Sequence, residues 1–199
     1  MSATAITYDR RMSRWEPNAR GRLEQAALEL YVEHGFEQTT VAEIAKRAGL
    51  TERTFFRHFA DKREVLFWGA DALQELLVST VASQPDSLAP IDAIAAALEA
   101  AGALLQQRRE FARQRQAAIA ANAGLQEREL IKLASLASAL ADTLRRRGVA
   151  DPAASLAAEA GIAVFRIAFE HWVNETGPRD LPQLIRESLD ELKAVTAGK

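Results

Sequence analysis

The chain has 199 residues, of which 48% are hydrophobic and 26% charged, a composition typical of a folded globular protein. It contains no cysteine, which excludes disulfides, thiolate catalysis and cysteine-based zinc sites. The net charge of −2 lacks the basic excess of many small DNA-binding domains, so a nucleic-acid function must depend on local placement of charge. The N-terminus has no apolar core of signal-peptide length, and Asp92 and Glu99 interrupt the apolar stretch Ile91–Leu105. We therefore expect a cytoplasmic protein without a membrane span.

Helical periodicity runs along almost the whole chain. No segment alternates apolar and polar residues with β-branched enrichment, whereas apolar residues recur at spacings of three and four. The sequence predicts an all-α fold of about nine helices. Residues 1–17 are polar and aperiodic and are predicted to form a mobile arm. A first helix over residues 17–34 follows, and Gly35 ends it in the place of a left-handed C-cap.

Two short helices come next. Thr40 and Glu43 have the spacing of a capping box, in which each side chain satisfies a backbone donor at the start of a helix. Gly49 ends this second helix, and Thr51 is the expected N-cap of a third that reaches about Phe59. Two short helices joined through a glycine are the arrangement of a helix-turn-helix, whose second helix enters the major groove of DNA.

The third helix divides into two faces. Phe55 and Phe59 are four residues apart and point to the core, whereas Arg53, Phe56 and Arg57 lie on the opposite side. Arginine pairs with guanine through two hydrogen bonds, and threonine or phenylalanine can contact a thymine methyl group. Lysine, threonine and helix-start amides can bind phosphate. The residues predicted to contact DNA are Thr40, Thr51, Glu52, Arg53, Thr54, Phe56, Arg57, His58 and Lys62. The alternative is a helical hairpin with solvated charges.

Further helices are expected after this motif. A long fourth helix is predicted from Lys62 to Ala82, followed by a proline-containing loop over Ser83–Pro90. Asp151 and Pro152 have the pattern of an N-cap and a first helical position. The remaining helices are predicted at residues 91–107, 110–122, 125–147, 152–174 and 181–195.

The last two of these helices are candidates for a dimer interface. The penultimate helix has two apolar stripes, and a surface helix needs only one. One stripe contains Leu156, Ala160, Val164, Ile167 and His171, and the other contains Ile162, Phe165, Phe169 and Trp172. The last helix has a single stripe of Leu181, Leu184, Ile185, Leu189 and Leu192. Two such helices from each subunit would build a twofold interface. Completion of a monomer core is the alternative.

A small-molecule site is expected in the C-terminal part. Its candidate wall residues are Phe67, Trp68, Leu104, Phe111, Arg113, Phe165, Phe169 and Trp172. Each of them also fits an ordinary core position. Arginines surround Phe111, and the alternatives there are a solvated helix face or one or two arginines that meet an anionic ligand.

Catalytic and metal chemistry find no support in the pattern. The three histidines have no metal-binding partner at helical spacing, and no glycine-rich phosphate loop or nucleophile elbow occurs. We expect no enzyme activity, no metal and no cofactor.

Residues 19–66 closely resemble the N-terminal domain of the TetR family of bacterial repressors. The matching elements include His34-Gly35-Phe36, Thr39-Thr40-Val41, Ala48-Gly49-Leu50 and the run from Thr54 to Phe59. The family usually has tyrosine at the position of Phe56, so a hydroxyl that could donate to phosphate is missing here. The C-terminal part resembles the family only in helix count, whereas the chain as a whole is similar to an actinobacterial branch that includes mycofactocin-associated regulators.

The resemblance implies a division into an arm (1–17), a helix-turn-helix domain (18–63) and a ligand-binding and dimerisation domain (64–199). It also implies a homodimeric repressor that binds double-stranded operator DNA and leaves it when a small-molecule effector binds. The alternative is a helical adaptor or small-molecule-binding protein that does not bind DNA.

Overall fold

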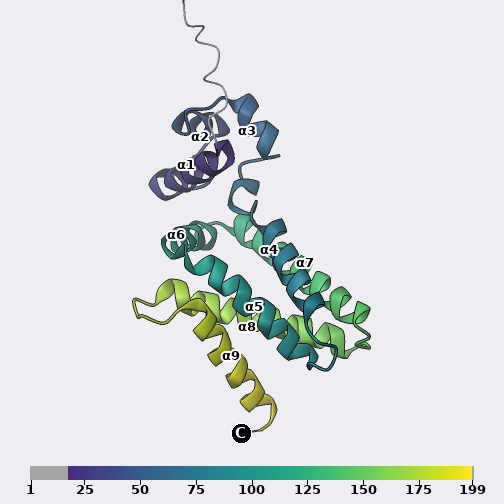
Figure 1. Ribbon diagram of the computed structural model, residues 1–199. Coiled ribbons are helices and arrows are strands. Elements are labelled where there is room, and N and C mark those ends of the chain that lie inside the picture. The colour runs from purple at the N-terminus through teal and green to yellow at the C-terminus, as the bar shows by residue number, and fades with distance from the viewer. Residues whose placement is uncertain (1–17, 199) are drawn as a thin grey trace, which may run out of the picture. The chain divides into compact units, whose positions relative to one another are not determined.

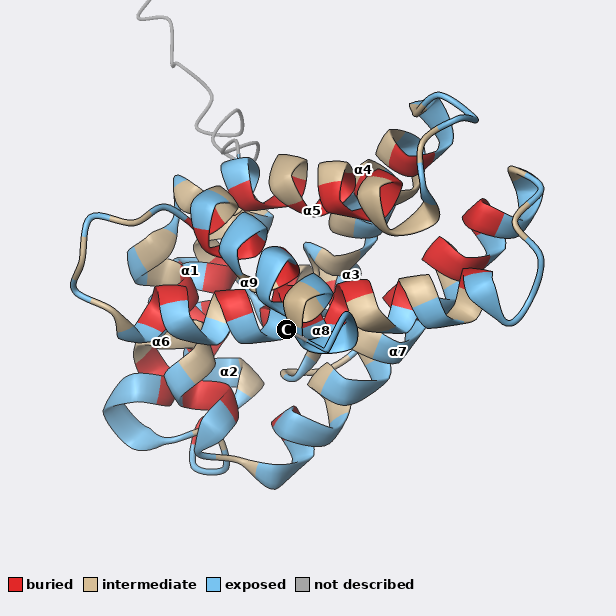
Figure 2. Cartoon of the chain, turned by 90° about the horizontal axis from the view of Figure 1, so that it is seen from below, coloured by how far each residue is buried: buried red, intermediate tan, exposed pale blue. Residues whose placement is uncertain are grey.

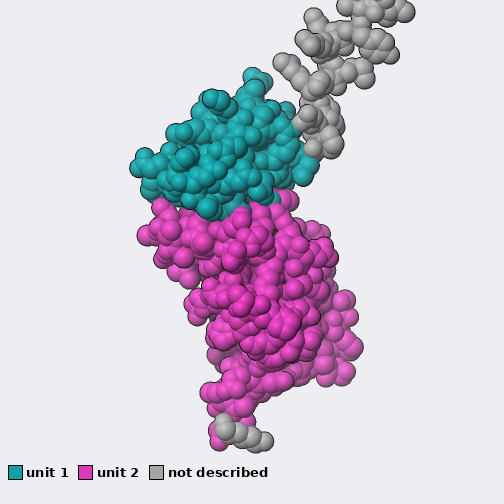
Figure 3. Space-filling model, turned by 90° about the vertical axis from the view of Figure 1, so that its left-hand side faces the viewer, with its two compact units in different colours: residues 1–65 teal, residues 66–199 magenta. Residues whose placement is uncertain are grey.

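The computed structural model describes residues 18–198, so the predicted arm lies outside the described residues. Within this range the chain forms nine α-helices and one 3₁₀ turn, with no strand (Figure 1). The all-α prediction is therefore confirmed. The chain divides into two compact units, one ending at Val65 and one beginning at Leu66, shown in teal and magenta in Figure 3. The sequence placed this boundary after residue 63.

The first unit is a three-helix domain. Its helices are α1 (Ala19–His34), α2 (Val41–Arg47) and α3 (Glu52–His58). One face of α1 is buried, and Ile44, Ala45 and Phe55 extend that core from the other two helices. A small hydrophobic core therefore fixes α2 and α3 against α1.

The second unit contains the remaining helices. They are α4 (Ala70–Ser83), α5 (Pro90–Gln106), α6 (Arg109–Ala120), α7 (Ala123–Arg146), α8 (Ala153–Asn174) and α9 (Leu181–Thr196). The elements after residue 83 lie close to their predicted positions. The predicted start of α8 at Pro152 is one residue early, because Pro152 is the N-cap.

The prediction of one continuous helix from Lys62 is wrong. The carboxylate of Asp61 accepts hydrogen bonds from the amides of Arg63 (2.8 Å) and Glu64 (3.2 Å), which forms a tight turn. A 3₁₀ turn over Glu64–Leu66 follows, and α4 begins only at Ala70. The segment between Lys62 and Ala70 is therefore a connector rather than the first turns of α4.

Helix α5 is the centre of the second unit and packs against α4, α8 and α9. Small side chains allow this close packing. A Cβ at Gly161 of α8 would clash with Cγ2 of Ile94, and one at Gly102 would lie 2.9 Å from Cδ1 of Ile185 on α9. Figure 2 shows buried residues along both α5 and α8. Gly102 therefore serves close helix packing.

One described segment, Glu64–Ser83, is long and apolar enough to cross a membrane by length and composition. In the structure this segment is divided by the turn before Ala70, and α4 packs against α5 and α7. A core helix of a soluble protein passes the same test, so one such segment is weak evidence for a membrane protein.

Candidate DNA-binding interface and C-terminal site

The start of α2 is fixed by the predicted capping box. The amide of Glu43 donates to Oγ1 of Thr40 (3.2 Å), and the amide of Thr40 donates to the Glu43 carboxylate (2.8 Å). These hydrogen bonds hold the pKa of Glu43 below its ordinary value, the backbone bond from Thr40 being the largest cause. The side chain of Thr40 remains exposed at the helix N-terminus, where the helix dipole favours an anion.

The turn between α2 and α3 depends on Gly49. The amide of Leu50 donates to the carbonyl of Ala45 (2.8 Å), and the amide of Gly49 donates to that of Lys46 (3.0 Å). This pattern is a Schellman motif, which requires a left-handed residue, and Gly49 has φ +66°. The guanidinium of Arg22 also donates to the carbonyl of Ala48. A Cβ at Gly49 would lie 2.8 Å from Nη2 of Arg22, so glycine is required for space as well.

Helix α3 presents the two faces that the sequence predicted. Phe55 and Phe59 are buried with ring centroids 5.6 Å apart, whereas Phe56 is 56% exposed. Thr51 is the N-cap and accepts a hydrogen bond from the amide of Thr54 (3.2 Å). Of the residues predicted to contact DNA, Thr40, Thr51, Glu52, Arg53, Phe56 and Arg57 are exposed, and Thr54, His58 and Lys62 are half-buried. The helix therefore offers two arginines and an aromatic ring to a partner.

Positive charge gathers at the C-terminal end of α3. The guanidinium of Arg20 lies 5.9 Å from the centroid of the Phe59 ring. The ring of His58 lies next to that same Phe59 ring. Burial lowers the pKa of His58 below its ordinary value, and the charges of Arg57 and Arg20 lower it further. His58 is therefore neutral at neutral pH, and its Nε2 atom is buried without a hydrogen-bond partner.

Lys62 lies against the first unit rather than extending from it. Its ammonium donates to the carbonyls of Phe36 (2.8 Å), Glu37 (3.2 Å) and Thr39 (2.9 Å). It also lies 4.4 Å from the centroid of the Phe36 ring. The Lys62 ammonium, which was predicted to contact a DNA phosphate, therefore binds backbone carbonyls of the protein itself.

In the second unit, three of the predicted ligand-binding residues form an aromatic row on α8. Ring centroids are 5.8 Å apart for Phe165 and Phe169, and 5.6 Å apart for Phe169 and Trp172. Trp172 is fully buried, yet its indole Nε1 has no hydrogen-bond partner. The side chain of Leu104 is 52% exposed and lies outside the core. Phe67 is buried, and both Trp68 and Phe111 are half-buried.

The arginines near Phe111 have different roles. Arg109 donates to the carbonyl of Trp172 (2.7 Å) near the end of α8 and to that of Gly177 (3.2 Å) in the loop that follows. Arg115 of α6 donates to the carbonyl of Leu66 (2.8 Å) and pairs with Glu129 of α7 (3.1 Å).

Arg108 and Arg113 complete this group. Arg108 lies 4.0 Å from the centroid of the Phe111 ring. Arg113 pairs with Glu110 (2.9 Å) on an exposed face. The sequence left two alternatives for these arginines, a solvated helix face or contact with an anionic ligand. Arg113 lies on a solvated face.

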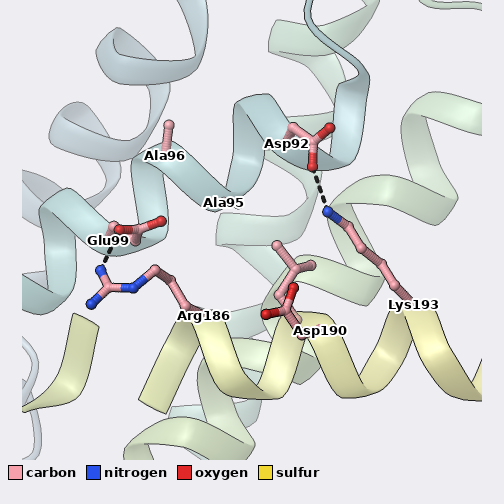
Figure 4. A pocket seen from close by; sticks show the side chains of 8 residues that line it. Asp92, Ala95, Ala96, Glu99, Arg186, Asp190 and Lys193 are labelled. Carbon is pink, nitrogen blue, oxygen red and sulfur yellow. Dashed lines mark hydrogen bonds and ion pairs between the residues drawn. The ribbon is translucent and has the colours of Figure 1, made fainter. Parts of the chain in front are cut away.

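A surface hollow of about 300 Å³ lies between α5 and α9. Ion pairs span it from Lys193 to Asp92 (2.8 Å) and from Arg186 to Glu99 (2.6 Å), as Figure 4 shows. Its other lining residues are Ala95, Ala96, Leu189 and Asp190. None of the predicted ligand-binding residues lines this hollow. Among the described residues, no group of three or more His, Asp or Glu side chains is placed to hold a metal ion.

Two family models match the chain. The model of the bacterial regulatory proteins of the tetR family matches residues 24–67, and that of the MftR C-terminal domain matches residues 88–197. The chain belongs to the TetR family. It is a transcriptional regulator with a DNA-binding domain, and the resemblances to this family and to its mycofactocin-associated branch are confirmed.

Related regulators match to different extents. The chain is 26% identical over 174 residues to a Mycobacterium tuberculosis protein named as the mycofactocin biosynthesis transcriptional regulator MftR, covering 85% of this chain and 87% of that protein. It is 38% identical over 81 residues to the transcriptional regulator TcmR of Streptomyces glaucescens. That match covers 41% of this chain and only 36% of TcmR. These relatives are named as regulators, not as enzymes.

Solved TetR-type structures share the fold. The complex of SmeT with triclosan has a TM-score of 0.65 at 23% identity, covering 89% of this chain and 90% of SmeT. Bacillus subtilis FadR in complex with stearoyl-CoA has a TM-score of 0.63 at 20% identity, covering 86% of this chain and 96% of FadR. At these identities the likeness concerns the fold alone.

Several arginines that hold this TetR-family regulator together have no signal in the sequence. Arg22 and Arg109 bind backbone carbonyls far along the chain, and Arg47 pairs with Glu33 across two helices (2.7 Å). Periodicity identifies which face of a helix is apolar, but it says nothing about which distant carbonyl an arginine reaches. Only the unpaired helix ends, which need donors or acceptors, indicate that such partners must exist.

Proposed function

We propose that this regulator is a homodimeric repressor that releases operator DNA when a small molecule binds its C-terminal unit. The observation that carries the DNA-binding part is the exposed face of α3. Arg53, Phe56 and Arg57 point outward while Phe55 and Phe59 anchor the helix in the core. Such a face has the donors and apolar surface for reading base edges, and the exposed Thr40 at the start of α2 would bind phosphate. This role places the protein in the cytoplasm, with the chromosome.

The homodimer is supported by the exposed stripe of α8. Leu156 is 66% exposed and Ile167 is 45% exposed, and the exposed or half-buried Ala160 and Ala163 lie between them. The predicted stripe of α9 is largely buried against its own unit, so α8 would supply most of the apolar contact. Pairing of this stripe with its symmetry mate would remove apolar surface from water. A dimer would also present two copies of α3 to two half-sites.

Ligand binding is supported by the aromatic row of Phe165, Phe169 and Trp172. The unpartnered indole N–H of Trp172 would donate to an acceptor on an otherwise apolar molecule. Triclosan and stearoyl-CoA, the molecules bound by SmeT and FadR in those structures, are suitable first probes. A probe that releases DNA should change the emission of Trp172 and lose that effect in Trp172→Phe. Release without a change in this emission would place the site elsewhere.

The effect of ligand binding would reach the DNA-binding domain through the connector before α4. Arg115 of α6 holds the carbonyl of Leu66 and lies 4.9 Å from the centroid of the Phe67 ring, while Glu129 of α7 holds Arg115. A ligand that shifts α6 or α7 would therefore move Leu66 and Phe67 in the middle of this connector. Only a ligand with different affinities for the two states can shift the balance between them.

The deciding experiment is a titration of labelled duplex from upstream of the protein's own gene. A repressor of this kind should bind one such duplex far more tightly than random sequence, with affinity falling steeply as salt rises. A sample that is monomeric and ignores every upstream duplex at low ionic strength would refute the proposal. A helical adaptor would give that result.

A further inference from the structure

The side chain of Lys62 has more polar contacts than a solvated lysine. An ammonium has three N–H donors, and here three carbonyls accept from it, those of Phe36, Glu37 and Thr39. These carbonyls belong to the loop after α1, where backbone acceptors are left without helical partners. The ammonium of Lys62 therefore gathers three acceptors of this loop, of which the carbonyl of Phe36 also accepts from the amide of Thr39 (3.3 Å).

One of these contacts fixes the peptide group that begins α2. The carbonyl of Thr39 accepts from Lys62, and the amide of Thr40 in the same peptide plane donates to Glu43 (2.8 Å). The side chain of Thr39 is buried, and its hydroxyl donates to the carbonyl of Gly35 (2.8 Å). Because a peptide group is planar, the contacts on its two sides set the direction in which Thr40 and the first amides of α2 point.

The backbone of Lys62 is anchored as well. Its carbonyl accepts a hydrogen bond from the hydroxyl of Tyr31 (2.6 Å), which is buried in α1. Burial raises the pKa of Tyr31 above its ordinary value, so this hydroxyl stays a donor at any physiological pH. The ring of Tyr31 contacts that of Phe36 edge-on, with centroids 5.2 Å apart. Both ends of Lys62 are thus tied to the region that precedes α2.

We infer that Lys62 is a positioning residue, whose ammonium sets the start of α2 for DNA instead of neutralising a phosphate. This inference rests on the proposed DNA-binding function and replaces the phosphate contact expected from the sequence. A phosphate contact would require the ammonium to give up its hydrogen bonds to these three carbonyls.

The experiment compares Lys62→Met, which keeps the stem and removes charge and donors, with Lys46→Met as a charge-matched control on α2. Hydrogen exchange is measured on the full chain without DNA. We expect Lys62→Met to speed exchange of the amides of Thr40 to Glu43 while the core amides of α1 are unchanged. Lys46→Met should leave both sets unchanged. Unchanged exchange at Thr40 in Lys62→Met would overturn the inference whether or not the protein binds DNA.

Operator binding separates positioning from direct contact. The probe is a duplex selected from random sequence by the wild-type protein. We expect Lys62→Met to lose about tenfold in affinity for this duplex. The slope of log affinity against log salt concentration should be unchanged, because a positioning residue releases no counterion itself. A slope reduced by about 0.9, the value for one lost phosphate contact, would overturn the inference. So would unchanged affinity.

If Lys62→Met does not fold, Lys62→Arg takes its place. Arginine binds phosphate at least as well as lysine but replaces the compact ammonium by a planar fork. Positioning predicts lower affinity and faster exchange at Thr40 in this variant, and full retention of both would overturn the inference. Failure of the wild-type protein to select any duplex would instead count against the proposed function.

Discussion

Arg22 of α1 reaches across the turn between α2 and α3 and donates to the carbonyl of Ala48. The contact lies directly beside Gly49, so the same residue closes the Schellman motif and leaves room for the guanidinium. The angle between the two short helices thus depends on one residue without a side chain.

Gly49→Ala should lower the free energy of unfolding by about 2–4 kcal/mol, since it adds left-handed strain and displaces Arg22. Gly148→Ala is the matched control, because Gly148 has φ +85° but nothing within 4 Å of its added Cβ. That variant should lose only about 1 kcal/mol. Chemical denaturation measures both, and equal losses would show that the contact with Arg22 contributes nothing.

Arg53→Ala should relax base specificity. An arginine paired with guanine through two hydrogen bonds contributes about 1–3 kcal/mol of discrimination, so the preference for the selected operator over its single-base variants should fall by that amount. Lys46→Ala, an exposed cation on α2, is the control and should weaken all duplexes alike. Binding titrations over a set of variant duplexes measure the difference. A uniform loss in Arg53→Ala would assign it to phosphate.

His58 should make stability depend on pH. Its folded-state pKa lies below its ordinary value of about 6.5, so the unfolded chain binds the proton more readily. The contribution is therefore present above about pH 6.5 and is lost as the pH falls toward the folded-state pKa. Unfolding free energies across this range should vary less in His58→Gln than in the wild type. His171→Gln, at an exposed position on α8, should keep the wild-type dependence.

Ile167→Glu should dissociate the dimer without unfolding the subunit, because it buries a charge only when α8 meets its mate. We expect the dimer dissociation constant to rise at least about 100-fold. Leu130→Glu, at an exposed position on α7 that is 59% exposed, should leave the dimer intact. Sedimentation velocity distinguishes the two. A dimer that survives Ile167→Glu would place the interface away from this stripe.

Arg109→Met should lower the free energy of unfolding by about 2–3 kcal/mol, because carbonyls at the end of α8 lose charge-assisted hydrogen bonds. Arg113→Met removes an exposed ion pair of the same helix and should change stability far less, because solvent screens that pair. Thermal unfolding of both variants makes the comparison. Similar effects would mean that the carbonyl contacts of Arg109 add little.

Most of the fold follows from local rules. Helix positions after residue 83, the capping box at Thr40 and the opposed faces of α3 are all set by interactions within a few residues, which periodicity and capping patterns record. The start of α4 is the exception, because Asp61 draws the following amides into a turn and away from a helix. Propensity alone does not reveal such competition.

The candidate site is less accessible to prediction than the fold. The exposed positions of Arg53, Phe56 and Arg57 follow from helical spacing, but the position of the Lys62 ammonium does not. Its acceptors lie more than twenty residues earlier in the chain and are backbone atoms, which carry no sequence signature. The same holds for Arg115, whose acceptor is the carbonyl of Leu66.

The absence of a side chain at Gly161, where Ile94 fills the space, has a kinetic consequence. Any ligand that enters between α5 and α8 has to separate two helices that are in close contact where Ile94 packs against the backbone of Gly161. Its entry would wait for rare excursions of the backbone, so the observed association rate should level off as ligand concentration rises instead of increasing without limit. The plateau would then report how often the interior opens by itself.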